Sequence, residues 1–219
     1  MRLYTAPLSM FGMKVEIAAY EKCLAPEIFM VDYSAATGYS PKHPEVLRVN
    51  PKGQVPVLID GEAEIYDSTQ IFEYLEDAVP EPALWPRDRL ARAKARQLEH
   101  ASDEVYFPNI IRLMSLQDDL DGEAANTARA GAENYCRRME SRLATQAFLA
   151  GEFSFADIAL FMAVVYGERL GAPLTVETPK LAAWRDAMAR RSSVLPVMQR
   201  LVAYLYANNR FVPDFLKAL

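Results

Sequence analysis

The first third of the chain mixes strand-like and helix-like spacing of its hydrophobic positions. Short hydrophobic runs predict strands at Arg2–Thr5 and Glu27–Val31. Between them, apolar residues recur at helical spacing and predict a helix over about residues 11–22. Residues 44–48 can add one helical turn after the second strand. This part of the chain therefore starts in the order β-α-β-α.

A hairpin and a further helix follow. Residues 57–59 and 64–66 are predicted strands on either side of Asp60-Gly61, a dipeptide that favours a tight turn. A helix is expected over about residues 68–77, because the apolar residues there share one face. The order β-α-β-α-β-β-α is that of the thioredoxin fold. We therefore expect an α/β thioredoxin-like domain over residues 1–78.

Residues 79–87 contain three prolines, which marks them as a linker between domains. Only helical patterns follow, so we expect an all-α domain over residues 88–219. Pro108 should kink the first of its helices. The expected helices span about residues 90–116, 123–146, 155–169, 179–191 and 194–208.

Two features of the second part are interpreted as structural. Ser154 and Asp157 have the spacing of a capping box, in which each side chain satisfies free N–H groups at the start of a helix. The C-terminal tail carries Phe211, Phe215 and Leu216, which are apolar enough to pack back on the body.

Composition narrows the functional classes. The formal net charge is −5, which argues against the basic face that nucleic-acid binding requires. The longest apolar run, Ile158–Tyr166, is far shorter than the ~20 residues of a membrane helix. The N-terminus has no apolar signal segment. We therefore expect a cytoplasmic protein that binds neither nucleic acid nor membrane.

Few residues of the chain suit metal or thiol chemistry. Cys23 and Cys136 are too few for a disulfide framework, and we expect both as buried or partly buried free thiols. His43 and His100 are not spaced as metal ligands, so no metal is expected. The chain also lacks the G-x-G-x-x-G, C-x-x-C and G-x-S-x-G motifs.

The segment Gln54–Val57 places a proline immediately before a buried strand, where it cannot donate to a sheet ladder. A cis Val55–Pro56 bond would turn the Val55 backbone outward. Its N–H and C=O groups would then be free to pair with an extended peptide. The alternative is a trans proline at an ordinary strand start.

Two serines lie where helices are predicted to begin. Ser9 lies between the first strand and the first helix, and Asp67-Ser68 directly follows the last strand. Each site can be a plain N-cap, which satisfies free backbone N–H groups. Asp67-Ser68 can instead form an anion site, with Ser68 on a carboxylate and Asp67 facing an ammonium.

These motifs in this order resemble the N-terminal domain of cytosolic glutathione transferases. The resemblance rests on strand–Ser9–helix, then N-P-K-G-Q-V-P-V-L, then Y-D-S-T-Q-I. Ser9–Val15 is most similar to the serine-type classes such as tau, phi and zeta, and the chain looks like a bacterial-type member. Leu84-Trp85-Pro86 and Leu149–Asp157 resemble parts of the family's second domain, so the resemblance covers most of the chain.

The resemblance implies a detoxifying transferase with glutathione as co-substrate. Ser9 would be its catalytic residue, stabilising the glutathione thiolate with its hydroxyl hydrogen and without acting as a base. The Val55 backbone would hold the cysteinyl residue, and Asp67, one methylene shorter than the family's usual glutamate, would hold the γ-glutamyl end with Ser68. The residues implied to bind glutathione are Lys42, Gln54, Val55, Asp67 and Ser68, although Lys42 can equally be a solvated surface lysine.

The second substrate would be a hydrophobic electrophile bound between the domains. Apolar residues at helical spacing can also be plain core, so both interpretations stay open for its candidate wall. The family is usually homodimeric, and Asp103 lies where some classes send an acidic side chain to the partner's glutathione. The candidate wall residues are Phe11, Phe107, Ile110, Ile111, Met114 and Tyr166.

Two other functional classes remain alternatives. One is a non-catalytic binding or interaction protein with the same fold. The other is a specialised glutathione-dependent isomerase, dehalogenase, lyase or peroxidase, because the fold alone does not determine the chemistry.

Overall fold

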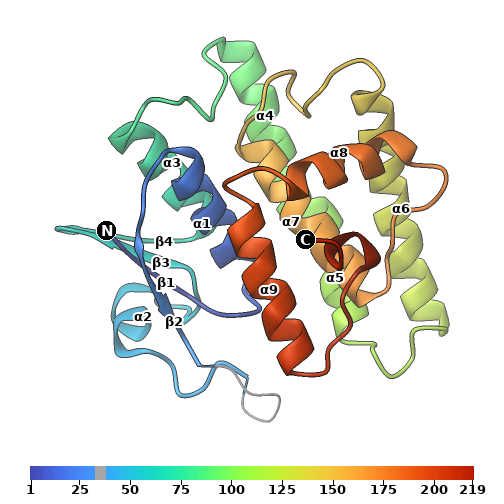
Figure 1. The fold of residues 1–219 in the computed structure, drawn as a ribbon, viewed down its shortest axis with the longest axis horizontal. Helices are drawn as coiled ribbons and strands as arrows, with labels where there is room; N and C mark the ends of the chain where they lie inside the picture. Colours follow the sequence, from blue (N-terminus) through green and yellow to red (C-terminus); the bar gives the residue numbers. More distant parts are fainter. Residues whose placement is uncertain (33–37) are drawn as a thin grey trace.

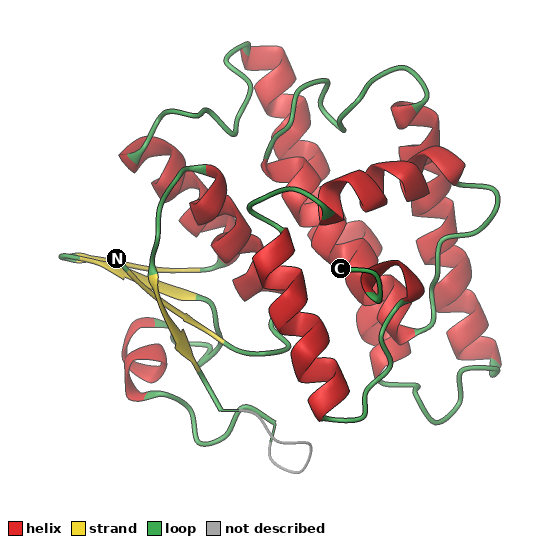
Figure 2. Cartoon of the chain, viewed as in Figure 1, coloured by secondary structure: helices red, strands yellow, loops and turns green. Residues whose placement is uncertain are grey.

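Two structurally different parts make up the molecule. The computed structural model describes residues 1–32 and 38–219. Strands and short helices occupy one end, and a larger group of helices lies beside them, as Figures 1 and 2 show. An α/β first part followed by an all-helical second part confirms the fold class expected from the sequence.

The sheet has the strand order β2-β1-β3-β4. Its strands are β1 (Arg2–Thr5), β2 (Glu27–Met30), β3 (Val57–Asp60) and β4 (Ala63–Tyr66). β1 runs parallel to β2 and antiparallel to β3, and β3 and β4 form the expected hairpin. Each strand lies within one residue of its predicted bounds, because short apolar runs and the Asp60-Gly61 turn are local signals.

Helices cover both faces of this sheet. α1 (Met10–Glu21) and α3 (Ser68–Ala78) pack on the face that carries Leu3 and Leu58, and both helices belong to the main core of the molecule. α2 (Pro44–Val49) packs on the opposite face, where the alternate strand residues form a smaller cluster. In Figure 1, α3 and α1 lie side by side above the sheet, with α1 toward the helical part.

The helix expected over residues 90–116 is divided in the structure. α4 (Arg89–Ala101) passes into a π-helical turn, Ser102–Tyr106, before α5 (Phe107–Met114) begins. Pro108 lacks an N–H, so a regular helix cannot run through it without losing a backbone hydrogen bond, and the wider turn precedes it. The other helices are α6 (Glu123–Leu143), α7 (Phe155–Leu170), α8 (Pro179–Ala189), α9 (Leu195–Ala207) and a 3₁₀ turn, Asp214–Leu216.

α7 forms the centre of the helical part. Every residue from Phe155 to Gly167 is buried, as expected for a helix that is apolar on all sides. The Ser154–Asp157 capping box is confirmed. Asp157 also accepts hydrogen bonds from the Leu149 N–H at 3.0 Å and from the Trp184 indole N–H at 3.2 Å. This buried carboxylate therefore ties the start of α7 to α8 and to the preceding loop, and burial raises its pKa to about 6.

A buried ion cluster joins the two parts of the molecule. The Lys14 side chain on α1 has no exposed surface, and its Nζ lies 2.6 Å from Asp103 Oδ2 and 3.3 Å from Glu99 Oε1. Thr69, at the start of α3, donates its hydroxyl to Glu99 Oε1 at 2.9 Å. Burial raises the pKa of Asp103 to about 6, while Lys14 acts in the opposite direction. One ammonium thus connects α1 directly to the helical part and, through Glu99, to α3.

Two expectations about side chains are wrong for one residue each. Of the tail residues expected to pack on the body, Leu216 is buried and Phe215 is partly buried against the core, but Phe211 is 61% exposed. Cys23 is exposed just after α1, where the backbone has a φ of +57°, because the chain turns out of the helix at that residue. Cys136 is buried, as expected.

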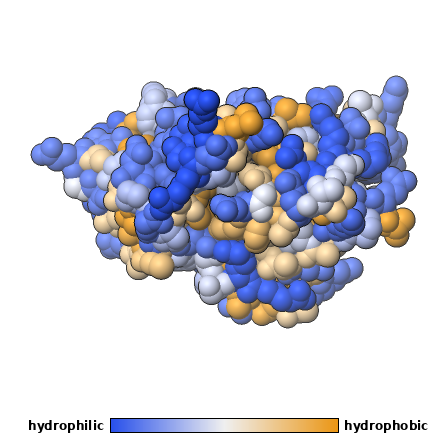
Figure 3. All heavy atoms as spheres, turned by 90° about the horizontal axis from the view of Figure 1, so that it is seen from above, coloured by the Kyte–Doolittle hydropathy of each residue, from blue (hydrophilic) through white to orange (hydrophobic). Residues whose placement is uncertain are grey.

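The face seen in Figure 3 is mostly hydrophilic, with hydrophobic residues in small separate groups. Within the described residues, no helix combines the length and hydrophobicity that crossing a membrane requires.

The Asp157 carboxylate should contribute strongly to stability. Asp157→Ala should lower the free energy of unfolding near pH 7 by about 2–4 kcal/mol, because four donor contacts lose their acceptor inside the protein. Urea denaturation followed by circular dichroism measures this loss. Asp118→Ala is the control, since Asp118 is exposed on a turn, and an equal loss in both variants would contradict the role given to Asp157.

The loss in Asp157→Ala should also depend on pH. The pKa of Asp157 is about 6 in the folded protein against an ordinary value of 3.8, so folding takes up a proton between these values. The stabilisation from this group therefore falls as the pH rises from about 4 to about 6. The difference in stability between wild type and Asp157→Ala should be smaller near pH 7 than near pH 5.

Removal of the Lys14 ammonium should destabilise the contact between the two parts. Lys14→Met should cost about 3–5 kcal/mol, because it leaves two carboxylates in a buried site without a counterion. Thermal and urea unfolding measure this cost.

Arg96→Met is the matched control for Lys14→Met. Arg96 on α4 pairs with Glu73 on α3, but both side chains are well exposed. An exposed pair of this kind contributes about 1 kcal/mol or less. If both variants lost a similar amount of unfolding free energy, burial of the Lys14 cluster would not make it more stabilising than an exposed ion pair.

Candidate active site

The three sequence motifs meet at one edge of the sheet, the edge formed by the ends of the strands and not by an outer strand. In the strand register, Tyr4 lies opposite Val57, and Val57 lies opposite Tyr66. The carboxyl end of β1, the amino end of β3 and the carboxyl end of β4 therefore share this edge, which faces the helical part in Figure 1. The residues that follow or precede the strands there are Ser9, Val55, Asp67 and Ser68.

Ser9 is the N-cap of α1. Its Oγ accepts a hydrogen bond from the Gly12 N–H at 3.0 Å, and the residue is only 7% exposed. A Cβ on Gly12 would lie 1.8 Å from Thr5 Oγ1, so glycine is what lets the helix start so close to β1. The capping role uses a lone pair of Ser9 and leaves its hydroxyl hydrogen available to a ligand.

Val55 presents its backbone at the same edge. The Val55–Pro56 peptide bond is cis, Pro56 is buried and Val55 is half-buried. Val55 lies outside β3, and its N–H and C=O groups form no hydrogen bond with any residue that the structure describes. These groups can therefore pair with an extended ligand.

Asn50 holds the loop that leads to Val55, and sequence analysis missed it. Its buried side chain donates to the Gln54 carbonyl at 2.7 Å and accepts from the Lys52 N–H at 2.9 Å. The sequence signal was the Asn-Pro-Lys-Gly turn, in which an asparagine often bonds to the backbone two residues on.

Asp67 and Ser68 begin α3. Asp67 Oδ1 accepts from the N–H groups of Thr69 and Gln70, so the N-cap interpretation is correct for Asp67. Asp67 is exposed and has a φ of +74°, an unusual conformation for a residue other than glycine. The Ser68 side chain is buried, and its hydroxyl has no hydrogen-bond partner among the described residues. The cap therefore leaves one Asp67 oxygen and the Ser68 hydroxyl for a ligand.

Lys42 and Gln54 are the exposed members of the predicted set. Both lie in the segments that lead into and out of α2, and the Lys42 ammonium forms no ion pair with a described residue. His43 caps α2 by accepting from the Glu45 N–H, which gives it a structural role. Asp103, considered for a partner's glutathione, has Oδ2 bonded to Lys14 of its own chain.

Three of the residues predicted for the second substrate form an aromatic row. The Phe11 and Phe107 ring centroids are 5.5 Å apart with edge-to-face geometry. The Phe107 and Tyr166 centroids are 6.3 Å apart. Phe11 lies two residues after Ser9, so the row leads from the candidate catalytic serine to α7.

The other three residues lie differently on α5. Ile110 has no exposed surface and belongs to the core, whereas Ile111 and Met114 are about half exposed, at 47% and 54%. Residues three and four apart share a helix face, so spacing alone groups Ile110 with Ile111 and Met114, and only the packing of α5 separates the buried residue from the two exposed ones.

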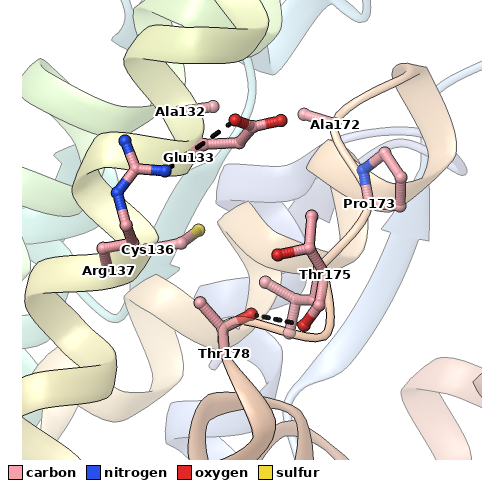
Figure 4. A pocket seen from close by; sticks show the side chains of 9 residues that line it. Ala132, Glu133, Cys136, Arg137, Ala172, Pro173, Thr175 and Thr178 are labelled. Carbon is pink, nitrogen blue, oxygen red and sulfur yellow. Dashed lines mark hydrogen bonds and ion pairs between the residues drawn. The ribbon is translucent and has the colours of Figure 1, made fainter.

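A separate hollow lies in the helical part, between α6 and the segment after α7 (Figure 4). Its volume of about 10 Å³ holds at most one water molecule. Cys136 lines it, and burial raises the pKa of this thiol to about 12, so it stays protonated near neutral pH. Among the described residues, no group of three or more His, Cys, Asp or Glu side chains is placed to hold a metal ion.

Two sequence profiles match the chain. The profile of the glutathione S-transferase N-terminal domain matches residues 3–83. That of the glutathione S-transferase C-terminal domain matches residues 104–192. Both profiles describe domains of one family.

Relatives and solved structures agree with these profiles. Glutathione S-transferase 3 of Zea mays is 32% identical over 218 residues, covering 93% of each chain. Glutathione S-transferase 1 of Dianthus caryophyllus is 37% identical, but the match spans only about half of each chain, 53% of this one and 49% of the relative. A crystal structure of a Methylobacillus flagellatus glutathione S-transferase with GSH bound is 28% identical, with a TM-score of 0.77, covering 90% of this chain and 98% of the other.

The site geometry, both profiles and the full-length similarity lead to one assignment. The chain belongs to the glutathione S-transferase family.

Proposed function

We propose that this protein is a glutathione S-transferase that transfers the glutathione sulfur to a hydrophobic electrophile, with Ser9 stabilising the thiolate. The carrying observation is that the Ser9 hydroxyl, at the start of α1, shares one edge of the sheet with the free backbone of Val55 and the free hydroxyl of Ser68. Residues 1–78 bind glutathione, residues 79–87 link the domains, and residues 88–219 supply the second pocket. We extend the proposal to a cytoplasmic homodimer with a role in detoxification.

Glutathione lies along the sheet edge in this proposal. The Val55 N–H and C=O groups pair with its cysteinyl residue, as an added strand pairs with a sheet edge. Ser68 and the N–H groups at the start of α3 bind the γ-glutamyl carboxylate, and Asp67 faces the ammonium. Gln54 and Lys42 meet the remaining polar ends, and the exposure of both side chains supports this.

The free energy needed to ionise the thiol is within reach of this site. A free thiol has a pKa of about 8.5, and lowering it by about two units requires about 2.7 kcal/mol. A hydrogen bond to a charged group contributes about 1.5–3 kcal/mol, and a helix N-terminus adds about 0.3–1 kcal/mol. Ser9 at the start of α1 supplies both, so no histidine is required.

The reaction then needs one bond exchange. The thiolate sulfur forms a bond to an electrophilic carbon, and the leaving group departs with the electron pair of its own bond. The thiol proton leaves to solvent when glutathione binds as thiolate. Ser9 keeps its own proton throughout and donates a hydrogen bond to the sulfur.

Ser9→Ala should impair ionisation of the bound thiol. Its pKa should rise by about 1–2 units, and kcat/KM near neutral pH with an electrophilic aryl halide should fall about 10–100-fold. The ultraviolet absorbance of the thiolate across a pH series, together with conjugation kinetics, measures both effects. If the pKa of the bound thiol were the same in Ser9→Ala as in the wild type, the role given to Ser9 would be wrong.

The control for Ser9→Ala is Ser141→Ala. Ser141 lies exposed on α6 and bonds only to the Arg137 carbonyl among the described residues, so kinetics should not change. Calorimetry on the wild type separates the alternatives. Glutathione binding without turnover of any electrophile would favour a non-catalytic binding protein.

Ser68→Ala should weaken glutathione binding with little effect on the thiol. The buried hydroxyl contributes a hydrogen bond to the γ-glutamyl carboxylate, so Kd should rise about 10-fold or more while the pKa of the bound thiol stays unchanged. Asp67→Asn should raise Kd as well, because it removes the charge opposite the ammonium but keeps a capping oxygen. Calorimetry with glutathione measures both variants, and an unchanged Kd in both would place the γ-glutamyl group elsewhere.

A further inference from the structure

A row of aromatic rings connects Ser9 to an arginine on α7. Phe11, Phe107 and Tyr166 follow one another at 5.5 and 6.3 Å between ring centroids. The guanidinium carbon of Arg169 lies over the Tyr166 ring, 4.6 Å from its centroid. The cation therefore stands at the end of the row that begins beside Ser9.

Arg169 has no carboxylate partner within the described residues. Its Nε is buried without a hydrogen-bond partner, and it forms no ion pair with a described residue. Glu168, its neighbour in sequence, is engaged by Arg185. The sequence of residues 33–37, outside the described part, contains neither Asp nor Glu.

The main groups that act on Arg169 do not include a carboxylate. They are the hydroxyls of Tyr166 and Tyr39 and a second cation, Arg210. Burial and the charge of Arg210 lower the pKa of Arg169, while the two tyrosines act in the opposite direction. A half-buried cation with an enclosed Nε, stacked on an aromatic ring and near another cation, is costly unless an anion compensates it.

The other partly buried arginines of the helical part include several that are compensated. Arg185 pairs with Glu168, Arg191 with Glu21 and Arg200 with Glu16. Arg129 and Arg142 form no such pair but donate to backbone carbonyls, whereas Arg169 has neither kind of partner among the described residues. Its planar guanidinium suits two parallel hydrogen bonds to a carboxylate or a sulfonate.

Resting on the transferase function proposed above, we infer that Arg169 binds an anionic group of the second substrate. The preferred electrophile is then an aromatic acid, whose ring packs along Phe11, Phe107 and Tyr166 and whose carboxylate pairs with Arg169. This orientation directs the opposite end of the substrate toward Ser9 and the thiolate. The aromatic row and Arg169 together thus favour a substrate that has an apolar body and a negative charge at the end away from the reacting carbon.

A matched pair of electrophiles tests this inference. Chloronitrobenzoate and chloronitrobenzamide have similar rings and the same leaving group, but only the first is charged. Wild type should have a kcat/KM for the acid at least about 10-fold above that for the amide. Arg169→Gln should bring this ratio close to one, while turnover of the amide and the Kd for glutathione stay unchanged.

Two further variants sharpen the result. Arg169→Lys keeps the charge but not the planar fork, so it should retain part of the preference for the acid. Arg112→Gln removes an exposed arginine of α5 and should leave the ratio unchanged. An unchanged ratio in Arg169→Gln, or loss of turnover of both electrophiles, would overturn the inference. A weaker Kd for glutathione alone would assign Arg169 to the peptide's own carboxylate and would overturn it too.

Binding of inert ligands separates this inference from the proposed function. Nitrobenzoate and nitrobenzamide lack a leaving group, so calorimetry measures their affinity whether or not the protein catalyses conjugation. Wild type should bind the acid about 10-fold more tightly than the amide, and Arg169→Gln should lose the difference. If no electrophile is conjugated but this difference is found, the transferase function fails and the anion site stands.

Discussion

The buried ammonium of Lys14 is the contact on which the position of the candidate site depends most. Ser9 caps the same helix five residues earlier, so the orientation of α1 determines where the hydroxyl points. Glu99 and Asp103 hold Lys14 from the helical part, and Glu99 also binds Thr69 at the start of α3. The helix starts that present Ser9 and Ser68 therefore share one anchor. Because that anchor is ionic and buried, both charges must be present for either to be tolerated.

Local signals explain how much of the fold the sequence predicts. The Asp60-Gly61 turn, the Ser154–Asp157 capping box and the apolar run of α7 each depend on residues a few positions apart, and all three are found in the structure. The π-helical turn before Pro108 was not predicted. The proline indicated a kink in one helix, but which hydrogen bonds replace the lost one depends on how α4 and α5 pack against α7.

Some residues of the candidate site could likewise be predicted from local sequence signals, and others could not. Ser9, Val55 and Ser68 could be found from short motifs because each adjoins a strand end or a helix start, where backbone groups are free. Asn50, Lys14 and Arg169 could not. A lysine within an apolar helix and an arginine near the end of another suggest solvated surface charges by sequence alone. Only the packed structure shows that Lys14 is enclosed by partners from a distant segment and that the half-buried Arg169 has no carboxylate partner in the part of the chain that the structure describes.

The placement of Arg169 at the far end of the aromatic row from Ser9 is consistent with the chemistry of thiolates. A thiolate becomes less nucleophilic as its pKa falls, so the strongest possible stabilisation does not give the fastest transfer. A neutral hydroxyl at a helix N-terminus lowers the pKa enough for ionisation near neutral pH and leaves the sulfur reactive. A guanidinium at that place would stabilise the thiolate further and weaken it as a nucleophile. With three aromatic rings between Ser9 and Arg169, the cation can act on the electrophile, where its charge contributes to binding, while Ser9 acts on the sulfur.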